Sequence, residues 1–182
     1  MSKVFIFGAP GSGKTSTSRY LKLLLNYPLV EGDYIRECIA RLTKTREQDA
    51  YLYMSTKETW RNFGPLNEEN MRKGLEASRQ SMKPFLDNEI AIHDGNLILE
   101  GCFLDPEYSK LGPFFLVVTR DEVRHREQFF KHRPQDQNNE ELFRASRVLQ
   151  EVLMQTAQQY CMPIIANEGP GATAKVIAEQ LQ

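Results

Sequence analysis

The chain has 182 residues, of which 41% are hydrophobic and 26% charged, a composition typical of one folded globular domain. No apolar run reaches the ~20 residues of a membrane span, and the formal net charge of −1 argues against a broad basic surface for nucleic acid. The cysteines, Cys38, Cys102 and Cys161, are odd in number and lack CxxC spacing. We therefore expect free thiols in a reducing compartment, with the cytoplasm as the default.

The first half of the chain begins with a predicted strand at Val4–Phe7, a helix at Thr15–Leu25 and a short strand at Leu29–Glu31. A helix is predicted at Tyr34–Leu42, where Ile35, Ile39 and Leu42 recur at helical spacing. Two long helical segments follow, at about Gln48–Asn62 and Asn67–His93, and Pro84 is expected to kink or divide the second one.

The second half continues with strands at Asn96–Glu100, Phe114–Thr119 and Pro163–Asn167, and with helices at Asp121–His132, Glu140–Tyr160 and Ala172–Leu181. Apolar strands separated by helices favour an α/β fold, a mostly parallel five-stranded sheet with helices on both faces. No composition shift divides the chain, so residues 1–182 are predicted to form one domain. The helical stretch at about 43–93 forms an insertion between the second and third strands.

The strongest motif directly follows the first strand and matches G-x-x-x-x-G-K-[ST], the phosphate-binding P-loop. Glycines let the backbone turn its N–H groups toward phosphate oxygens, and the helix that follows adds the positive end of its dipole. The lysine supplies a charge for the β- and γ-phosphates and the threonine hydroxyl can bind Mg²⁺. The predicted nucleotide-binding residues are Gly8, Ala9, Pro10, Gly11, Ser12, Gly13, Lys14, Thr15 and Ser16.

Two acidic positions and one arginine follow predicted strands and complete a candidate site. Glu100 ends an apolar strand and is predicted to hold Mg²⁺ with Thr15 or to orient the acceptor; the alternative is a surface carboxylate. Asp33 is predicted to accept or position the acceptor hydroxyl, although it would also serve as a helix N-cap. Arg36 lies unfavourably in a first helical turn, which suggests an anionic substrate group rather than a solvated arginine.

The helix from Asp121 onward is predicted to carry catalytic arginines beneath a lid at about 124–139. With Val123 at 0°, helical geometry places Arg126 at about 300° and Arg133 at about 280°, within the apolar sector. Arg124 and Lys131 fall on the opposite, solvated side. Inward arginines need an anionic partner, such as a triphosphate; the alternatives are snorkelling or an internal ion pair.

Trp60 lies on a helical segment, where a core position is the ordinary interpretation; with Arg61 it forms a candidate wall of the substrate pocket. The guanine motif Asn-Lys-x-Asp of GTPases is absent from the sequence. A small-molecule kinase therefore remains the preferred class. A nucleotide-binding switch without catalysis is the main alternative, because a P-loop alone does not distinguish the two.

The chain resembles small P-loop kinases, and most closely the 2-phosphoglycerate kinase family. The resemblance covers about Val4 to Asn167, and the motifs occur in the same order as in that family. The matching pieces are GAPGSGKT at 8–15, Asp33-x-Ile35-Arg36-Glu37, Ser55-Thr56 to Trp60, Leu97-Ile98-Leu99-Glu100-Gly101, Asp121-Glu122 with His125-Arg126, and Met162-Pro163-Ile164. The resemblance implies ATP- and Mg²⁺-dependent phosphoryl transfer to a hydroxyl of a small anionic metabolite similar to 2-phosphoglycerate. The net charge and the lack of a long apolar run lead us to expect no nucleic-acid or membrane partner, and monomer and homodimer both remain open.

The sequence departs from this family after the third strand. Cys102-Phe103 stands where family members commonly carry a histidine shortly after Glu-Gly. A more apolar pocket would suit the related archaeal branch that phosphorylates mevalonate 3-phosphate. Mevalonate 3-phosphate 5-kinase activity is therefore the second expectation for the acceptor.

Overall fold

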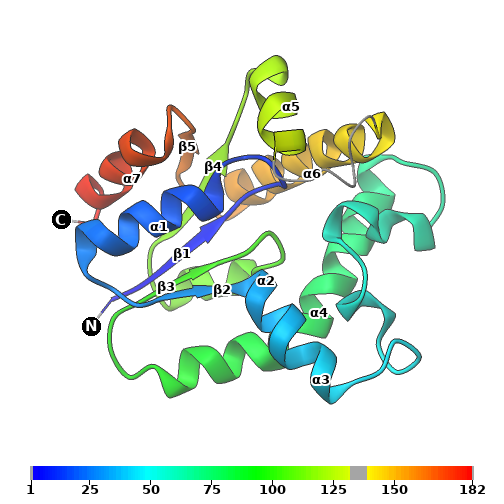
Figure 1. The fold of residues 1–182 in the computed structure, drawn as a ribbon, viewed down its shortest axis with the longest axis horizontal. Coiled ribbons are helices and arrows are strands. Elements are labelled where there is room, and N and C mark those ends of the chain that lie inside the picture. The colour runs from blue at the N-terminus through cyan, green and yellow to red at the C-terminus, as the bar shows by residue number, and fades with distance from the viewer. Residues whose placement is uncertain (1, 132–138, 182) are drawn as a thin grey trace.

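A computed structural model describes residues 2–131 and 139–181 of the chain. The described residues form an all-parallel sheet with the strand order β2-β3-β1-β4-β5 (Figure 1). The strands are β1 (Lys3–Phe7), β2 (Leu29–Glu31), β3 (Leu97–Glu100), β4 (Phe114–Val118) and β5 (Ile164–Ala166). The predicted α/β fold with five strands is confirmed.

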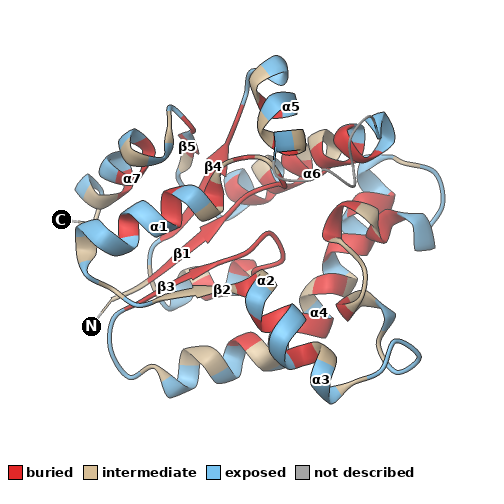
Figure 2. Cartoon of the chain, in the orientation of Figure 1, coloured by how far each residue is buried: buried red, intermediate tan, exposed pale blue. Residues whose placement is uncertain are grey.

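Each face of the sheet is covered by helices, and alternate residues of β1 show why. Val4 and Ile6 belong to an apolar cluster with side chains of α1 (Lys14–Leu25) and α7 (Pro170–Glu179). Phe5 and Phe7 pack into the larger cluster on the other face, with α4 (Glu68–Ile92) and α6 (Glu140–Gln159). The central strands are therefore buried on both sides (Figure 2), as parallel sheets require.

The strand order places the P-loop at the centre of the sheet edge where ligands bind in such folds. β1 lies between β3 and β4, so the chain leaves β1 at the point where the order of connection reverses. The segments that follow β2 and β3 end at the same edge because all strands run parallel. Side chains from these segments consequently converge in the crevice beyond the carboxyl ends.

The helix predicted at Tyr34–Leu42 is real but irregular. It consists of α2 (Gly32–Ile35), a π-helical segment (Arg36–Ala40) and α3 (Arg41–Thr43). The wider π turn shifts the buried face: Arg36 and Ala40 are buried, whereas Ile39 and Leu42 are exposed. The prediction that the three apolar residues share one packed side is therefore wrong for two of them.

The insertion between β2 and β3 is helical, but its first part differs from the prediction. Gln48–Asn62 does not form a long helix; it contains the short 3₁₀ segments η2 (Ala50–Leu52) and η3 (Thr56–Asn62). The predicted helix at Asn67–His93 is confirmed as α4, which begins where the Asn67 side chain accepts from the N–H of Asn70. Pro84 lies within this helix and does not divide it.

The remaining predicted helices are confirmed with small changes at their ends: α5 spans Glu122–Lys131, and α6 and α7 have the bounds given above. A short 3₁₀ segment at Pro106–Lys110 was not predicted; Asp105 caps it by accepting from the N–H of Glu107. No described helix is both long and apolar enough to cross a membrane.

Candidate active site

The loop between β1 and α1 has the backbone that its glycines predict. Gly11 and Gly13 adopt φ values of 84° and 88°, which side chains rarely tolerate. A Cβ on Gly13 would also lie 2.3 Å from Nδ2 of Asn167. Gly13 precedes α1 without a side-chain cap, so no side chain of its own occupies the helix N-terminus. This geometry leaves the N–H groups of the first helical turn available to an anion.

Side chains from distant elements hold the carbonyls of this loop. The Pro10 carbonyl accepts from Nε2 of His125 at 2.9 Å and from the hydroxyl of Ser146 at 2.7 Å. Arg147 donates to Nδ1 of the same imidazole at 3.2 Å, an arrangement that fits the neutral Nε2–H tautomer.

The carbonyl of Ser12, two residues further along the loop, is held by side chains that follow β5 and β4. It accepts from Nδ2 of Asn167 at 2.9 Å and from the hydroxyl of Thr119 at 3.2 Å. These contacts with the loop were not predicted, because single polar residues at strand ends and within helices form no motif that indicates them. Only their position relative to the P-loop gives them a function.

Lys14 and Glu100, both buried, form a compact group with the half-buried Thr15. The Lys14 ammonium lies 3.8 Å from the Glu100 carboxylate, and the Thr15 hydroxyl is 3.3 Å from both carboxylate oxygens. Glu100 is almost completely buried, and this burial raises the pKa of its carboxyl to about 7 against the opposing charge of Lys14. The predicted position of Glu100 facing the P-loop is thus confirmed, and a surface carboxylate is excluded.

Thr15 and Glu100 also offer the oxygens that a magnesium ion would use. Within residues 2–131 and 139–181, no cluster of three or more His, Cys, Asp or Glu side chains forms a complete metal site. Mg²⁺ bound to a nucleotide usually takes one or two protein oxygens and completes its shell with phosphates and water. A hydroxyl beside a buried carboxylate fits that donor set.

A cavity of about 590 Å³ opens on one side of the P-loop. Gly11, Gly13, Thr15 and Ser16 contribute the loop wall, and Asn167 and Pro170 contribute the wall that follows β5. Helix α5 adds Gln128 and Lys131. Since the P-loop forms its floor, this cavity is the candidate nucleotide side.

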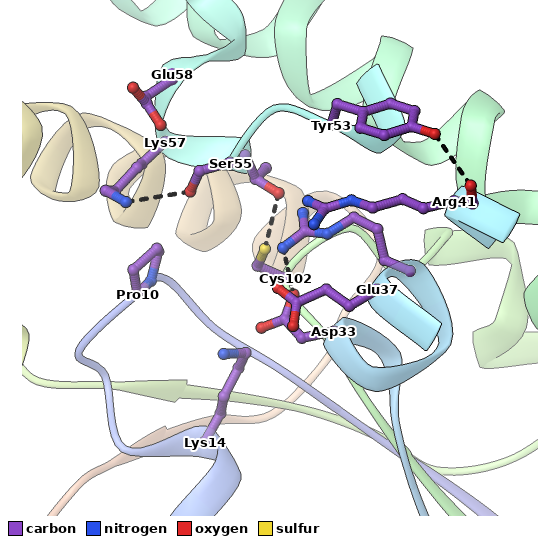
Figure 3. A pocket seen from close by; sticks show the side chains of 12 residues that line it. Pro10, Lys14, Asp33, Glu37, Arg41, Tyr53, Ser55, Lys57, Glu58 and Cys102 are labelled. Atoms are coloured by element: carbon purple, nitrogen blue, oxygen red, sulfur yellow. Dashed lines mark hydrogen bonds and ion pairs between the residues drawn. The ribbon is translucent and has the colours of Figure 1, made fainter. Parts of the chain in front are cut away.

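A second cavity, of about 420 Å³, lies on the other side of Lys14 and is rich in charged groups (Figure 3). Asp33 and Arg36 line it and form an ion pair at 2.7 Å. The remaining lining residues come from the P-loop, the π-helical segment, α3, η3 and the residues before it, and the loop after β3: Pro10, Lys14, Glu37, Arg41, Tyr53, Ser55, Thr56, Lys57, Glu58 and Cys102. This cavity is the candidate acceptor side, where the prediction placed Asp33 and Arg36.

Arg36 is held firmly in the wall of this cavity. Its guanidinium stacks 5.2 Å from the centre of the Phe103 ring and donates to the Met54 carbonyl at 3.4 Å. Its Nε is buried and makes no hydrogen bond within the described part of the chain. The solvated arginine considered from the sequence is excluded, and Phe103 supports this guanidinium. Asp33 lies inside the first turn and does not cap the helix.

Two predicted site residues lie elsewhere. Trp60 packs in the main apolar core and donates from Nε1 to the Lys57 carbonyl at 3.0 Å, so it is not a wall of either cavity. Arg126 is exposed, pairs with Glu140 and lies over the rings of Phe130 and Phe143. The prediction that Arg126 faces inward is wrong.

The error arose from the reference chosen for helix α5. Val123 is exposed, whereas His125 and Phe129 are completely buried, so the inner face lies away from Val123. Gln128 and Lys131 lie at the edge of this face and line the nucleotide-side cavity. Lys131 is exposed, as predicted, and it also lines this cavity. Arg133 and most of the tip of the predicted lid fall within 132–138, outside the described residues.

Comparison with known proteins agrees with this geometry. A family model described as an AAA domain matches residues 4–142, more than half of the chain. The chain belongs to this family. No curated protein matches the sequence of this AAA domain.

Solved structures share the fold of the AAA domain over nearly its whole length. A shikimate kinase from Bacteroides thetaiotaomicron is 19% identical, with a TM-score of 0.59 and coverage of 99% of this chain and 98% of that chain. A shikimate kinase from Acinetobacter baumannii in complex with shikimate is 16% identical, with a TM-score of 0.59 and coverage of 100% and 93%. Deoxyadenosine kinase from M. mycoides is 13% identical, with a TM-score of 0.53 and coverage of 98% of both chains.

These likenesses show a P-loop kinase fold. They do not assign the chain to the 2-phosphoglycerate kinase family that the motifs resemble, and the substrate is therefore a matter of the site itself.

Proposed function

We propose that this AAA domain is an ATP-dependent kinase that phosphorylates a hydroxyl of a small anionic metabolite. The observation that carries the proposal is the position of Lys14, which lines both the P-loop cavity and the charged cavity beside it. A protein that only binds a nucleotide needs the first cavity. A second, charged cavity that meets the first at the P-loop lysine is what transfer between two bound molecules requires.

The residues would divide the work as follows. The P-loop N–H groups and Lys14 hold the β- and γ-phosphates, while Lys131 faces the same cavity from α5. Asp33 faces the acceptor hydroxyl and takes its proton or positions it. Thr15 and Glu100 would hold Mg²⁺, which offsets charge on the phosphates when it is bound.

The acceptor cavity favours a hydroxylated acid over an apolar or nucleoside substrate. Its walls present guanidinium and ammonium groups from Arg36, Arg41 and Lys57, which suit a carboxylate or phosphate. Asp33 and Glu37 offer acceptors for hydroxyl groups. Phe103 lies behind Arg36 and does not line the cavity, so it does not make the pocket apolar. A metabolite of the 2-phosphoglycerate type remains our first candidate, and mevalonate 3-phosphate is the second.

The test is ADP release in a coupled assay with ATP and Mg²⁺, screened over phosphorylated hydroxy acids, sugar acids and mevalonate phosphates. We expect at least one acidic acceptor to raise ADP release well above the rate without acceptor. Lys14→Ala should abolish that increase and leave the fold intact, whereas Lys22→Ala, an exposed position on the same helix, should behave as the unchanged protein.

Two results would contradict the proposal. Near-normal turnover by Lys14→Ala would remove the P-loop lysine from the reaction. Tight binding of ATP without stimulation by any acceptor would favour the nucleotide-binding switch.

A further inference from the structure

Lys57 is a buried cation that the P-loop motif does not account for. It lies on η3, in the helical insertion, and only 6% of its surface is exposed. It nevertheless lines the acceptor-side cavity together with Lys14 and Pro10 (Figure 3). An ammonium group fixed in the wall of a cavity is placed to contact an anion that binds there.

The contacts around Lys57 fix the direction of its side chain. The ammonium donates to the Ser55 hydroxyl at 3.2 Å and lies 5.9 Å from the centre of the Phe129 ring. Since Phe129 belongs to α5, these contacts bring the insertion and α5 to the same side of the P-loop. The ammonium is therefore positioned by a hydroxyl of its own segment and by an aromatic ring of α5.

The backbone of Lys57 is held as well. Its carbonyl accepts from Nε1 of Trp60, and the Thr56 carbonyl accepts from the Thr59 hydroxyl at 2.9 Å. Helix α4 presses against this turn at Gly74, where a Cβ would lie 2.5 Å from the Thr59 hydroxyl oxygen. Such close packing prevents the segment from moving freely, so the ammonium is preorganised.

We infer that Lys57 is a catalytic residue whose ammonium contacts the phosphoryl group during its transfer, an inference that rests on the proposed kinase function. In that step the bond from the γ-phosphorus to the oxygen bridging the β-phosphate breaks, and its electron pair remains on ADP. A bond forms from the acceptor hydroxyl oxygen to phosphorus, and the hydroxyl proton passes to Asp33. Negative charge spreads over the phosphoryl oxygens between Lys14 and Lys57, where two cations from different elements stabilise it.

This inference replaces the function predicted for Arg126. A cation that acts on the phosphoryl group must line the cavity in which the group moves. Arg126 lies on the outer face of α5 with Glu140, whereas Lys57 lies within the cavity. Among the described residues, Lys57 is thus placed to act as predicted for Arg126. Because Lys57 belongs to the insertion between β2 and β3, the same segment would affect both acceptor binding and the rate of transfer.

The test compares Lys57→Met, Lys57→Gln and Lys57→Arg with Lys73→Met, a matched control at an exposed lysine of α4. Binding of ADP and of ADP with aluminium fluoride, which mimics the phosphoryl group in transfer, is measured by calorimetry. We expect the unchanged protein and the control to bind ADP with aluminium fluoride at least tenfold more tightly than ADP. The Lys57→Met and Lys57→Gln variants should lose this preference and keep their affinity for ADP, and Lys57→Arg should restore part of it.

The two proposals fail differently in this experiment. If Lys57→Met and Lys57→Gln keep the preference for aluminium fluoride, the inference is overturned and the kinase proposal stands. If the unchanged protein shows no such preference, the kinase proposal fails and the inference fails with it. Thermal unfolding of each variant identifies any that does not fold. If either Lys57→Met or Lys57→Gln fails to fold, the nucleotide affinities of the other one test the inference.

Discussion

At the scale of single residues, the buried carboxyl of Glu100 shows how the surroundings of a group set its pKa. Its burial outweighs the attraction of Lys14, and Asp33 and Glu31 add further negative potential. Together these effects raise the pKa of Glu100 to about 7 when no metal is bound. A divalent cation beside the carboxylate would favour its ionised form and would therefore lower this pKa.

The raised pKa predicts a specific dependence of stability on pH. Because the folded state holds this proton more tightly than the unfolded state, the stabilisation is complete below about pH 4.5 and is lost as the pH rises through about 7. In Glu100→Gln this titration is absent. Between pH 5 and pH 8 the free energy of unfolding of the unchanged protein should therefore fall relative to Glu100→Gln, by roughly 3 kcal/mol at most.

Urea unfolding at several pH values, without nucleotide and with a chelator present, provides the measurement. Glu89→Gln is the matched control, a carboxyl close to the C-terminal end of α4. The raised pKa would be refuted if the free energy of unfolding changed with pH in the same way for the unchanged protein and for Glu100→Gln over this range. With saturating Mg²⁺ and ADP, the difference between the two proteins should shrink or change sign.

The sequence could predict the residues of the site that act through a local pattern. These residues lie at or just after the carboxyl ends of strands, which parallel pairing brings to one edge of the sheet. They are GAPGSGKT after β1, the pair Asp33–Arg36 after β2, and the carboxylate that ends β3. His125 and Ser146 could not be predicted, because their contact with Pro10 joins residues more than a hundred positions apart. Lys57 was missed for a related reason: its segment was predicted as an ordinary helix.

At the scale of elements, helix α5 shows how the choice of the inner face decides the prediction of function. Apolar residues occur on more than one side of this helix, and Val123 is exposed, so hydrophobicity alone does not indicate its orientation. The buried imidazole of His125 does indicate it, since it anchors the helix to the P-loop. With the helix oriented in this way, Lys131 lines the cavity beside the P-loop and Arg126 does not.

This orientation predicts opposite results for two neutralising substitutions on the same helix. Lys131→Met should raise KM for ATP by roughly three- to tenfold and leave KM for the acceptor nearly unchanged, because Lys131 lines the nucleotide-side cavity. Arg126→Met should change KM for ATP by less than twofold, because Arg126 bonds to Glu140. Steady-state kinetics with each substrate varied in turn distinguish them. If Arg126→Met gave the larger effect, the orientation of α5 described here would be wrong in the working enzyme.

The π-helical segment after β2 illustrates a second limit of sequence patterns. Residues at i, i+4 and i+7 share a face only in a regular α-helix, and one wider turn moves later residues out of phase. The turn begins at Arg36, and beyond it Ala40 is buried while Ile39 is exposed. The apolar spacing in the sequence therefore does not indicate which residues of this segment are buried.

At the scale of the whole molecule, the P-loop is joined to most layers of the fold. Its carbonyls bond to side chains that follow β4 and β5 and to side chains of α5 and α6. The loop itself begins at the central strand, which is buried on both faces. Nucleotide binding should consequently stabilise the entire domain and not the loop alone.

This linkage predicts how far ADP raises the thermal midpoint. At a concentration near 100 Kd, ADP should add about 2.7 kcal/mol, which corresponds to a rise of roughly 5–10 °C for a chain of this size. In His125→Ala the Pro10 carbonyl loses one donor, and we expect about tenfold weaker binding. The same ADP concentration should then add only about 1.4 kcal/mol.

Thermal unfolding of both proteins at one fixed ADP concentration measures the difference, with His93→Ala as the matched control at the end of α4. Without ligand, His125→Ala is expected to unfold at a lower temperature than the unchanged protein, because a buried contact is lost. This decrease in the thermal midpoint would by itself reflect only packing. The decisive quantity is the increment produced by ADP. An increment as large as that of the unchanged protein would mean that the imidazole supports the fold without holding the P-loop in its binding shape; an increment reduced by about half would show that it does both.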